Sequence, residues 1–163
     1  MITGSYKGEN NMNKLLTLYN KFEKVPFGRK IFSILVCIKA PYFGSIKPVF
    51  VELQSGRCVM TMKKRRSVQN HIKSVHAIAM CNISELTAGT AIEAAIPSNM
   101  RWIPKKMSVE YLKVAKTDLK AVCDLQGIDW EKNQDVPMTV DVTDTNGVVV
   151  FRAIITMYVS HKK

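Results

Sequence analysis

Long apolar runs, paired cysteines and acidic residues are all scarce in this sequence of 163 residues. The longest apolar run, Ile31 to Ile38, includes a serine and is far shorter than the roughly 20 residues that a bilayer-spanning helix needs. Residues 1–13 are polar, and no apolar stretch follows a basic start, so no secretory signal is predicted. Apolar residues make up 47% and charged residues 23% of the chain, a composition typical of a single globular domain rather than of a disordered protein.

The cysteines lie far apart, and no two of them form a C-x-x-C pair. This distribution argues against a zinc site and against a disulfide framework. The three histidines have no ligand spacing either, so the sequence predicts no bound metal. Four reduced, mostly buried thiols indicate a cytoplasmic protein. They are Cys37, Cys58, Cys81 and Cys123.

Basic residues outnumber acidic residues by 24 to 13, which gives a formal net charge of +11. A polyanionic partner would account for the excess, because lysine and arginine neutralise phosphates. The sequence contains no helix-turn-helix, no zinc-finger spacing and no aromatic and glycine-rich RNA-binding signature, so nucleic acid is not the expected partner. A phosphate-bearing small molecule and a solvated surface are the remaining explanations. The basic clusters are Lys63 to Arg66, Lys73, Arg101 with Lys105 and Lys106, and Lys113, Lys116 and Lys120.

The composition divides the chain into three parts. Residues 1–11 are polar and rich in turn-forming residues, which predicts a disordered leader and makes Met12 a candidate natural start. Residues 12–44 are expected to form a helical segment. Residues 45–163 are expected to form the main domain, and no internal repeat or low-complexity segment interrupts them.

Two helices are predicted in the segment 12–44. From Asn13, apolar residues recur with the 3.6-residue period of an amphipathic helix, and Pro26 with Gly28 ends it. A second helix is expected over Arg29 to Lys39. We expect both to cover a sheet; the alternative is that these basic, amphipathic helices lie on a membrane surface.

Alternating strands and one long helix are predicted for the main domain. Ser55-Gly56 is a hairpin turn signal, and Asn146-Gly147 is a stronger one of type I′. Between them a helix is expected over Val75 to Ala95, with Ser74 as N-cap, and its many small and apolar residues indicate burial on most sides. The predicted strands are Lys47 to Leu53, Arg57 to Lys64, Met107 to Ala115, Leu119 to Leu125, Val136 to Thr143 and Val148 to Ser160.

This order of elements favours an α+β fold. Helices, a hairpin, one long helix and then a meander of three or four strands suit a strongly curved antiparallel sheet wrapped around a single central helix.

The residues around the long helix carry a motif with a definite spacing. Asn70 lies six residues before His76, Glu85 lies nine residues after it, and Gly89 lies four residues further on. This pattern resembles the hotdog-fold acyl-CoA thioesterases of the phenylacetyl-CoA and hydroxybenzoyl-CoA type. Over roughly residues 45–160 the chain is most similar to a thioesterase-like hotdog family of unassigned function, through the blocks APYFGSI, KRRSVQNHI and VHAIAMCN.

The resemblance implies hydrolysis of a thioester, with coenzyme A as part of the substrate and no separate cofactor. Glu85 would activate a water or attack the carbonyl, since a carboxylate buried on an apolar helix is a usable base near neutral pH. Asn70 would position the reacting groups, and His76 would hold the loop. Unpaired amides at the helix start, from Val75 to Ala77, would polarise the carbonyl. The residues expected to bind substrate, including lysines for the phosphates, are Lys73, Ser74, Val75, Ala77, Gly89, Lys113 and Lys116.

Two departures from the family pattern leave an alternative open. The usual His-Gly-Gly is His76-Ala77-Ile78 here, and a customary glycine three residues before the histidine is Lys73. Glycines permit a close approach of the backbone to the thioester. Their replacement favours a non-catalytic protein that binds acyl-CoA or an acyl carrier. A nucleophilic cysteine, Cys81 or Cys123 beside a histidine, is the competing enzymatic hypothesis.

The interval between His76 and Glu85 predicts an oligomer. Nine helical positions amount to about 900° of rotation and about 13.5 Å of rise, so the two side chains leave the helix on opposite sides. They cannot meet at one substrate within one chain. We therefore expect a site shared between two copies, in a homodimer or homotetramer, with Glu85 facing the Asn70 loop of the other copy.

Overall fold

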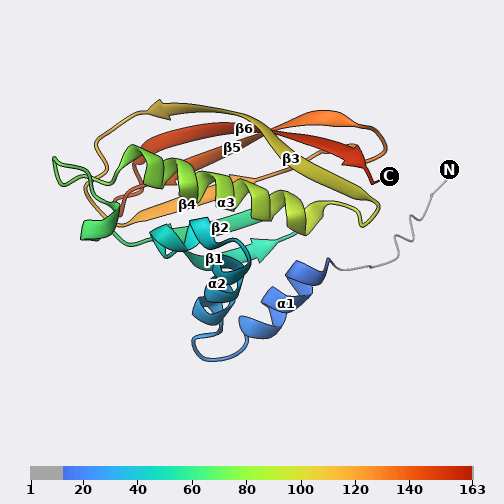
Figure 1. Ribbon diagram of the computed structural model, residues 1–163, viewed down its shortest axis with the longest axis horizontal. Coiled ribbons are helices and arrows are strands. Elements are labelled where there is room, and N and C mark those ends of the chain that lie inside the picture. The colour runs from blue at the N-terminus through green and yellow to red at the C-terminus, as the bar shows by residue number, and fades with distance from the viewer. Residues whose placement is uncertain (1–12, 163) are drawn as a thin grey trace, which may run out of the picture.

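The computed structural model describes residues 13–162, so the predicted leader and the candidate start at Met12 lie outside the described residues. The elements follow one another along the chain as Figure 1 shows. They are α1 (Lys14–Phe22), α2 (Gly28–Lys39), the 3-10 helix η1 (Pro41–Ile46), β1 (Val49–Gln54), β2 (Arg57–Met62), the 3-10 helix η2 (Arg66–Val68), α3 (Ala77–Ala95), β3 (Met100–Tyr111), β4 (Leu119–Asp124), β5 (Gln134–Thr143) and β6 (Val149–His161).

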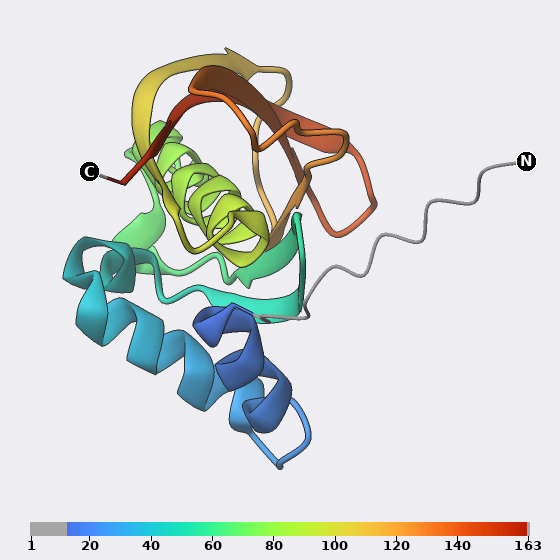
Figure 2. The same ribbon diagram turned by 90° about the vertical axis from the view of Figure 1, so that its right-hand side faces the viewer.

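The strands form one antiparallel sheet that curves around α3 (Figures 1 and 2). The order in the sheet is β1-β2-β4-β5-β6-β3. The hotdog architecture expected from the sequence is therefore confirmed. The predicted meander is present in β4, β5 and β6. Strand β3 pairs within residues 13–162 with β6 alone, and so forms the edge of the sheet opposite β1. None of the helices within residues 13–162 has the length and apolar character needed to span a bilayer.

Helix α3 is the centre of the core. Thirteen of its nineteen residues are buried, and Ala88 and Ala91 have no exposed surface at all. Small side chains at these positions let the strands approach the helix axis closely, and the inward residues of β5, such as Val136 and Val140, are also fully buried. The prediction of a helix buried on most sides is confirmed.

The start of α3 differs from the prediction. The helix begins at Ala77, with His76 as N-cap, rather than at Val75 with Ser74 as N-cap. The imidazole Nδ1 of His76 accepts the amide of Ile78 at 3.1 Å. The Ser74 hydroxyl instead accepts a hydrogen bond from the side-chain amide of Asn70 at 2.8 Å. A histidine ring nitrogen therefore takes the capping role that a serine was expected to have, and it satisfies the amide of Ile78.

The third strand also differs from the prediction. It was expected over Met107 to Ala115, but β3 runs over Met100–Tyr111. Its first half carries exposed basic residues, and its register shifts by one residue between Pro104 and Lys106. The bulge breaks the alternation by which a half-buried strand is recognised.

The N-terminal helices cover one end of the sheet, as predicted. The rings of Tyr19 and Phe32 pack edge to face at 5.2 Å, and Phe32 packs in the same way on Phe50 of β1 at 4.9 Å. The hydroxyl of Ser33 in α2 accepts the amide of Phe50 at 3.0 Å. Helix α2 therefore satisfies a backbone donor of the edge strand β1.

One buried hydroxyl of α3 has no partner. Ser84 is fully buried, and its Oγ makes no hydrogen bond within residues 13–162. An unsatisfied hydroxyl is costly to bury, and alanine favours a helix, so we expect Ser84→Ala to raise the free energy of unfolding by about 1 kcal/mol in urea titrations. Thr87→Val is the matched control, because Thr87 donates to the Ile83 carbonyl at 2.7 Å. That change should lower stability by about 1 kcal/mol, and an equal loss from Ser84→Ala would show that the Ser84 hydroxyl is satisfied.

Candidate functional site

A pocket of about 180 Å³ lies at the N-terminal end of α3, and we call it the N-terminal pocket. Three segments line it: η1 with the exposed ring of Tyr42, the segment Ser67 to Gln69, and the first turns of α3. His76 and Ile78 contribute from the helix. The pocket therefore lies at the end of the helix that carries the positive end of its dipole.

Two of the three amides predicted to polarise a carbonyl already have acceptors. The amide of Val75 donates to the Ala115 carbonyl at 2.8 Å, and that of His76 donates to the Val68 carbonyl at 2.8 Å. Within residues 13–162 the Ala77 amide has no acceptor. Of the expected donors at the helix start, Ala77 is the one left without an acceptor. It is not among the residues that line the N-terminal pocket, although its neighbours His76 and Ile78 are.

The imidazole of His76 is oriented by its own helix. Because Nδ1 accepts from the amide of Ile78, it carries no proton, and the neutral ring bears its proton on Nε2. The ring lines the N-terminal pocket. His76 thus combines a capping role with a second ring nitrogen that has no partner within residues 13–162.

Asn70 organises the loop before the helix. Its Oδ1 accepts the amides of Ile72 at 3.2 Å and Ser74 at 3.1 Å, while its Nδ2 donates to the Ser74 hydroxyl at 2.8 Å. The tight loop places Lys73 in the left-handed region with φ at 61°. The resemblance described above predicts a glycine at this position, and the left-handed conformation that favours glycine is present here although the residue is lysine. Asn70 does not line the N-terminal pocket, and its neighbour Gln69 does.

The structure does not bring Glu85 to the N-terminal pocket of its own chain. Glu85 is half-buried on α3 and is not among the residues that line this pocket. Within residues 13–162 its carboxylate makes no hydrogen bond and no ion pair, so it is not neutralised by a lysine of the same chain. A partner for Glu85 would have to come from a ligand, from water or from a second chain.

Ser45 and Asn82 line the pocket and were not predicted, and neither was Arg65, which contacts Ser45 from outside the lining. Asn82 is only 6% exposed, and its Nδ2 donates to the Ser45 hydroxyl at 3.3 Å while its Oδ1 has no partner. Arg65 donates to the Ser45 carbonyl at 2.8 Å, and its other terminal nitrogen, Nη1, is buried without a partner. Buried unpaired polar atoms are uncommon. A polar residue within the apolar stretch AIAMCNISEL was the sequence signal for Asn82.

The predicted phosphate-binding lysines lie on a segment that reaches the start of α3. Ala115, between Lys113 and Lys116, is the residue whose carbonyl accepts the Val75 amide. The Lys64 ammonium donates to the Lys116 carbonyl at 2.9 Å. Lysines of two basic clusters, Lys63 to Arg66 and Lys113 to Lys120, therefore lie beside the segment that leads into α3, where they would attract a polyanion.

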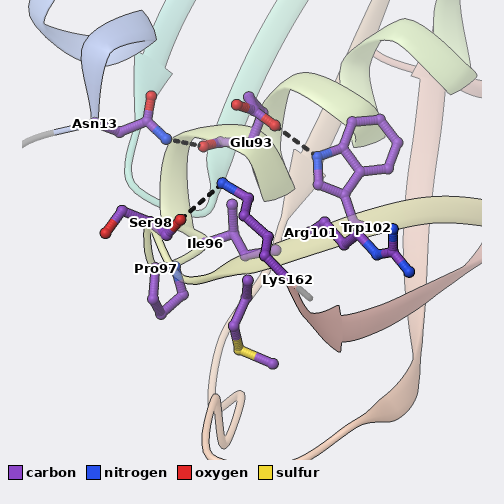
Figure 3. A pocket seen from close by; sticks show the side chains of 9 residues that line it. Asn13, Glu93, Ile96, Pro97, Ser98, Arg101, Trp102 and Lys162 are labelled. Carbon is purple, nitrogen blue, oxygen red and sulfur yellow. Dashed lines mark hydrogen bonds between the residues drawn. The ribbon is translucent and has the colours of Figure 1, made fainter.

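A larger pocket, of about 390 Å³, lies at the opposite end of α3 (Figure 3). Several of its polar groups are already paired. The Trp102 indole donates to the Glu93 carboxylate at 2.7 Å, and Lys162 donates to the Ser98 carbonyl at 2.7 Å. It contains none of the predicted site residues, and its cations lie at the negative end of the helix dipole.

The cysteines are protonated thiols. Burial raises the pKa of Cys37, of Cys58 and, despite a hydrogen bond with Tyr111, of Cys81. Burial also raises the pKa of Cys123 to about 12. A thiol is nucleophilic as the thiolate, so the competing cysteine hypothesis has no support in the structure. Within residues 13–162 no three His, Cys, Asp or Glu side chains are grouped to hold a metal ion.

The raised pKa of Cys123 predicts a pH dependence. Its ordinary value is 9.0, and the folded value is about 12, so the unfolded chain releases the proton first as the pH rises. The stabilising contribution is complete below pH 9 and is lost as the pH approaches 12. Between pH 9 and 12 we expect the free energy of unfolding to fall with pH in both proteins. The slope should be about 1.4 kcal/mol per pH unit smaller for Cys123→Ala than for the wild type. Equal slopes for the two proteins would contradict the assignment.

Gly89 lies against a tryptophan ring. A Cβ on Gly89 would lie 2.9 Å from Cη2 of Trp102. Overpacking destabilises a core by about 1–3 kcal/mol, whereas alanine stabilises a helix by about 1 kcal/mol relative to glycine. Gly89→Ala should therefore lower the free energy of unfolding by about 1 kcal/mol. In a Trp102→Phe background, which lacks that ring atom, the same change should be stabilising. Stabilisation by Gly89→Ala in the wild-type background would contradict the packing role.

Solved structures with the same fold include thioesterases. A structural-genomics crystal structure, APC5556, is 44% identical, has a TM-score of 0.81, and covers 91% of this chain and 99% of its own. A protein of unknown function from Pseudomonas aeruginosa, PA5026, described as a probable thioesterase, is 19% identical with a TM-score of 0.71 and covers 85% of this chain and 97% of its own. The thioesterase HI1161 from Haemophilus influenzae is 9% identical with a TM-score of 0.68 and covers 78% of this chain and 87% of its own.

The sequence also identifies a family. No curated protein matches the chain. Residues 28–159 match the family described as "Domain of unknown function (DUF4442)", a span that takes in α2, the central helix and all of the sheet except the last two residues of β6. The likeness to PA5026 and HI1161 shows the fold, and the family match covers most of the chain. The chain therefore belongs to the DUF4442 family and has a thioesterase-like hotdog fold.

Proposed function

We propose that this protein is an acyl-CoA thioesterase whose active site is shared between two copies of the chain. The observation that carries the proposal is the N-terminal pocket, which His76 lines at the positive end of the buried helix α3, next to an Ala77 amide that has no acceptor within residues 13–162. PA5026 and HI1161, which have the same fold, are described as a probable thioesterase and a thioesterase.

The two edges of the sheet support a dimer. Helix α2 satisfies the Phe50 amide on the β1 edge, whereas β3 at the other edge pairs only with β6. Strand β3 is 12 residues long and exposes Ile103 at 58% and Tyr111 at 56%. A long edge with exposed apolar side chains favours association with another chain. A second copy at this edge would come close to Glu85, since Tyr111 hydrogen-bonds Cys81, which lies one helical turn before it.

The mechanism assigns one role to each group. The Ala77 amide donates to the thioester carbonyl oxygen and stabilises the oxyanion that forms there. Glu85 of the other copy takes a proton from a water molecule, which attacks the carbonyl carbon. The tetrahedral intermediate then expels the coenzyme A thiolate, which takes up a proton, and leaves a carboxylic acid.

The surrounding residues hold the substrate. Lys73, Lys113 and Lys116 attract the phosphates of coenzyme A, which is part of the substrate and not a separate cofactor. Asn70 keeps the loop in shape beside the helix start. The four free thiols are consistent with a reducing, cytoplasmic location.

Two substitutions test the catalytic roles. Glu85→Gln removes the base, and Ala77→Pro removes the amide proton at the first helical position, where proline is well tolerated. We expect each to lower turnover of short, long or aromatic acyl-CoA substrates by roughly 10² or more, measured as thiol release. Glu93→Gln on the same helix is the matched control and should retain activity. If the wild type hydrolyses no substrate in the panel, or the variants match it, the catalytic proposal fails.

Mixing these two variants tests the shared site. In a mixed dimer one site carries both changes and the other carries neither. An equal mixture that exchanges subunits should therefore regain about one quarter of the wild-type activity. No recovery, or a wild-type protein that sediments as a monomer, would show that the site is not shared.

A second candidate function is binding of acyl-CoA or an acyl carrier without hydrolysis. The observation that favours it is Ile78, which is 55% exposed in the N-terminal pocket at a position where the thioesterases have glycine. Binding of a non-hydrolysable acyl-CoA analogue by a wild-type protein that hydrolyses no substrate would support this function.

A further inference from the structure

Helix α2 has an apolar face that no other part of the described chain covers. Its members recur at intervals of three or four residues and continue into η1, so they form one stripe along the helix. Phe27 is 76%, Ile38 70% and Tyr42 70% exposed. We call this face the outer stripe; it consists of Phe27, Ile31, Ile34, Leu35, Ile38 and Tyr42.

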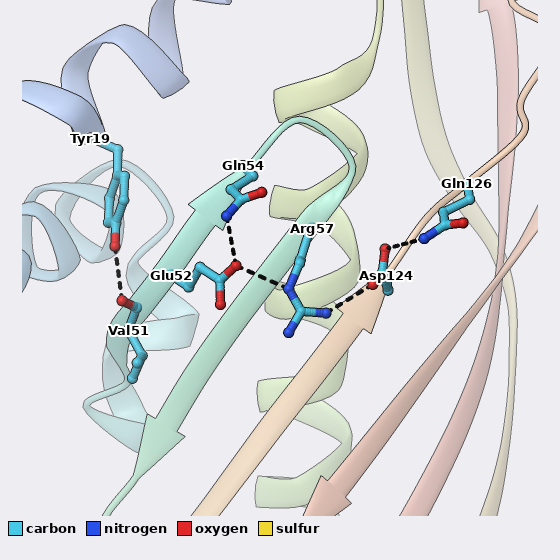
Figure 4. Close-up of polar contacts among 7 residues, drawn as sticks. All are labelled: Tyr19, Val51, Glu52, Gln54, Arg57, Asp124 and Gln126. Carbon is cyan, nitrogen blue, oxygen red and sulfur yellow. Dashed lines mark hydrogen bonds and ion pairs between the residues drawn. The ribbon is translucent and has the colours of Figure 1, made fainter.

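The opposite side of the same helix is fixed to the sheet. Phe32 and Ser33 are buried against β1, and Tyr19 of α1 donates to the Val51 carbonyl at 3.0 Å (Figure 4). Figure 2 shows both helices beyond β1, on the side of that strand away from α3. The core therefore accounts for one apolar side of α2 and leaves the outer stripe unused.

Basic residues surround the outer stripe. Residues 14–47 contain seven lysine or arginine residues and a single acidic residue, Glu23. On a helical projection Lys30 and Lys39 flank the stripe on its two sides. Both are exposed. Such side chains can keep their ammonium groups among phosphates while their methylenes lie along apolar surface.

We propose that the outer stripe docks the protein on the surface of an anionic lipid bilayer, with α2 lying in the plane of the interface. An apolar stripe bordered by lysines is the pattern of helices that insert one face at the level of the headgroups. Lysines beside an anionic leaflet are attracted by its negative surface potential. A second copy placed on the same face would bring two strongly basic surfaces together, so charge favours the lipid.

The docking face ends at the candidate functional site. Tyr42 is the last residue of the outer stripe and also lines the N-terminal pocket. A protein bound through this face holds that pocket beside the lipid surface. The inference does not depend on the reaction carried out in the pocket.

Vesicle co-sedimentation of the full chain tests the proposal. We expect binding to phosphatidylcholine vesicles that contain phosphatidylserine, weak binding to phosphatidylcholine alone, and loss of binding at high salt. Ile38→Ser should weaken binding roughly tenfold, because it removes one apolar side chain from the interface. Lys30→Glu with Lys39→Glu should weaken it by a similar factor. Ile154→Ser, at an exposed isoleucine on β6 outside the stripe, is the matched control and should bind as the wild type does.

Three results would overturn the inference. They are absence of wild-type binding to the anionic vesicles, equal binding by Ile38→Ser and the wild type, and equal binding to neutral and anionic vesicles. An oligomer that Ile38→Ser dissociates in the absence of lipid would assign the face to a second copy instead. Thermal unfolding of each variant shows whether a loss of binding reflects the surface or the fold, and all of these exposed substitutions should leave the unfolding temperature nearly unchanged.

Discussion

The close fit of the curved sheet around α3 is the constraint on which the rest of this structure depends. A helix enclosed in this way must carry small side chains where the strands approach most closely, and Ala88 and Ala91 meet that requirement. Enclosure leaves mainly the ends of the helix open to ligands. The two pockets described above lie at these ends, and the helix dipole distinguishes them. The N-terminal end, with an unpaired amide, suits a developing negative charge.

The two edges of the sheet differ in whether a helix covers them, and this difference explains where exposed apolar side chains lie on the surface. At β1 the edge is covered by α2, and the Ser33 hydroxyl satisfies the Phe50 amide. Covering an edge with a single layer of helix leaves the far side of that helix outside the core, and here that side is apolar and bordered by lysines. At β3 no element covers the edge within residues 13–162. One edge thus bears the proposed lipid-docking face, and the other bears the proposed interface between copies.

The motif residues have structural as well as functional reasons to be present. Asn70 makes three hydrogen bonds within its own loop, and Gly89 provides room for the ring of Trp102. Each of these structural roles is a sufficient reason for Asn70 or Gly89 to be present, even in a protein without catalytic activity. Glu85 is different, because its half-buried carboxylate has no hydrogen bond or ion pair within residues 13–162. It is the member of the motif whose presence the fold does not explain.

The sequence by itself determined the elements whose signals are local. The period of α1, the turn at Ser55-Gly56 and the alternation in β5 predicted those elements to within a few residues, because helix and turn preferences act between near neighbours. Only the tertiary structure decided where α3 begins, since distant carbonyls at Val68 and Ala115 hold the two residues before it in an extended conformation. It also decided the place of β3 and the meeting of Ser45, Arg65 and Asn82, because contacts between distant segments leave no periodic pattern in the sequence.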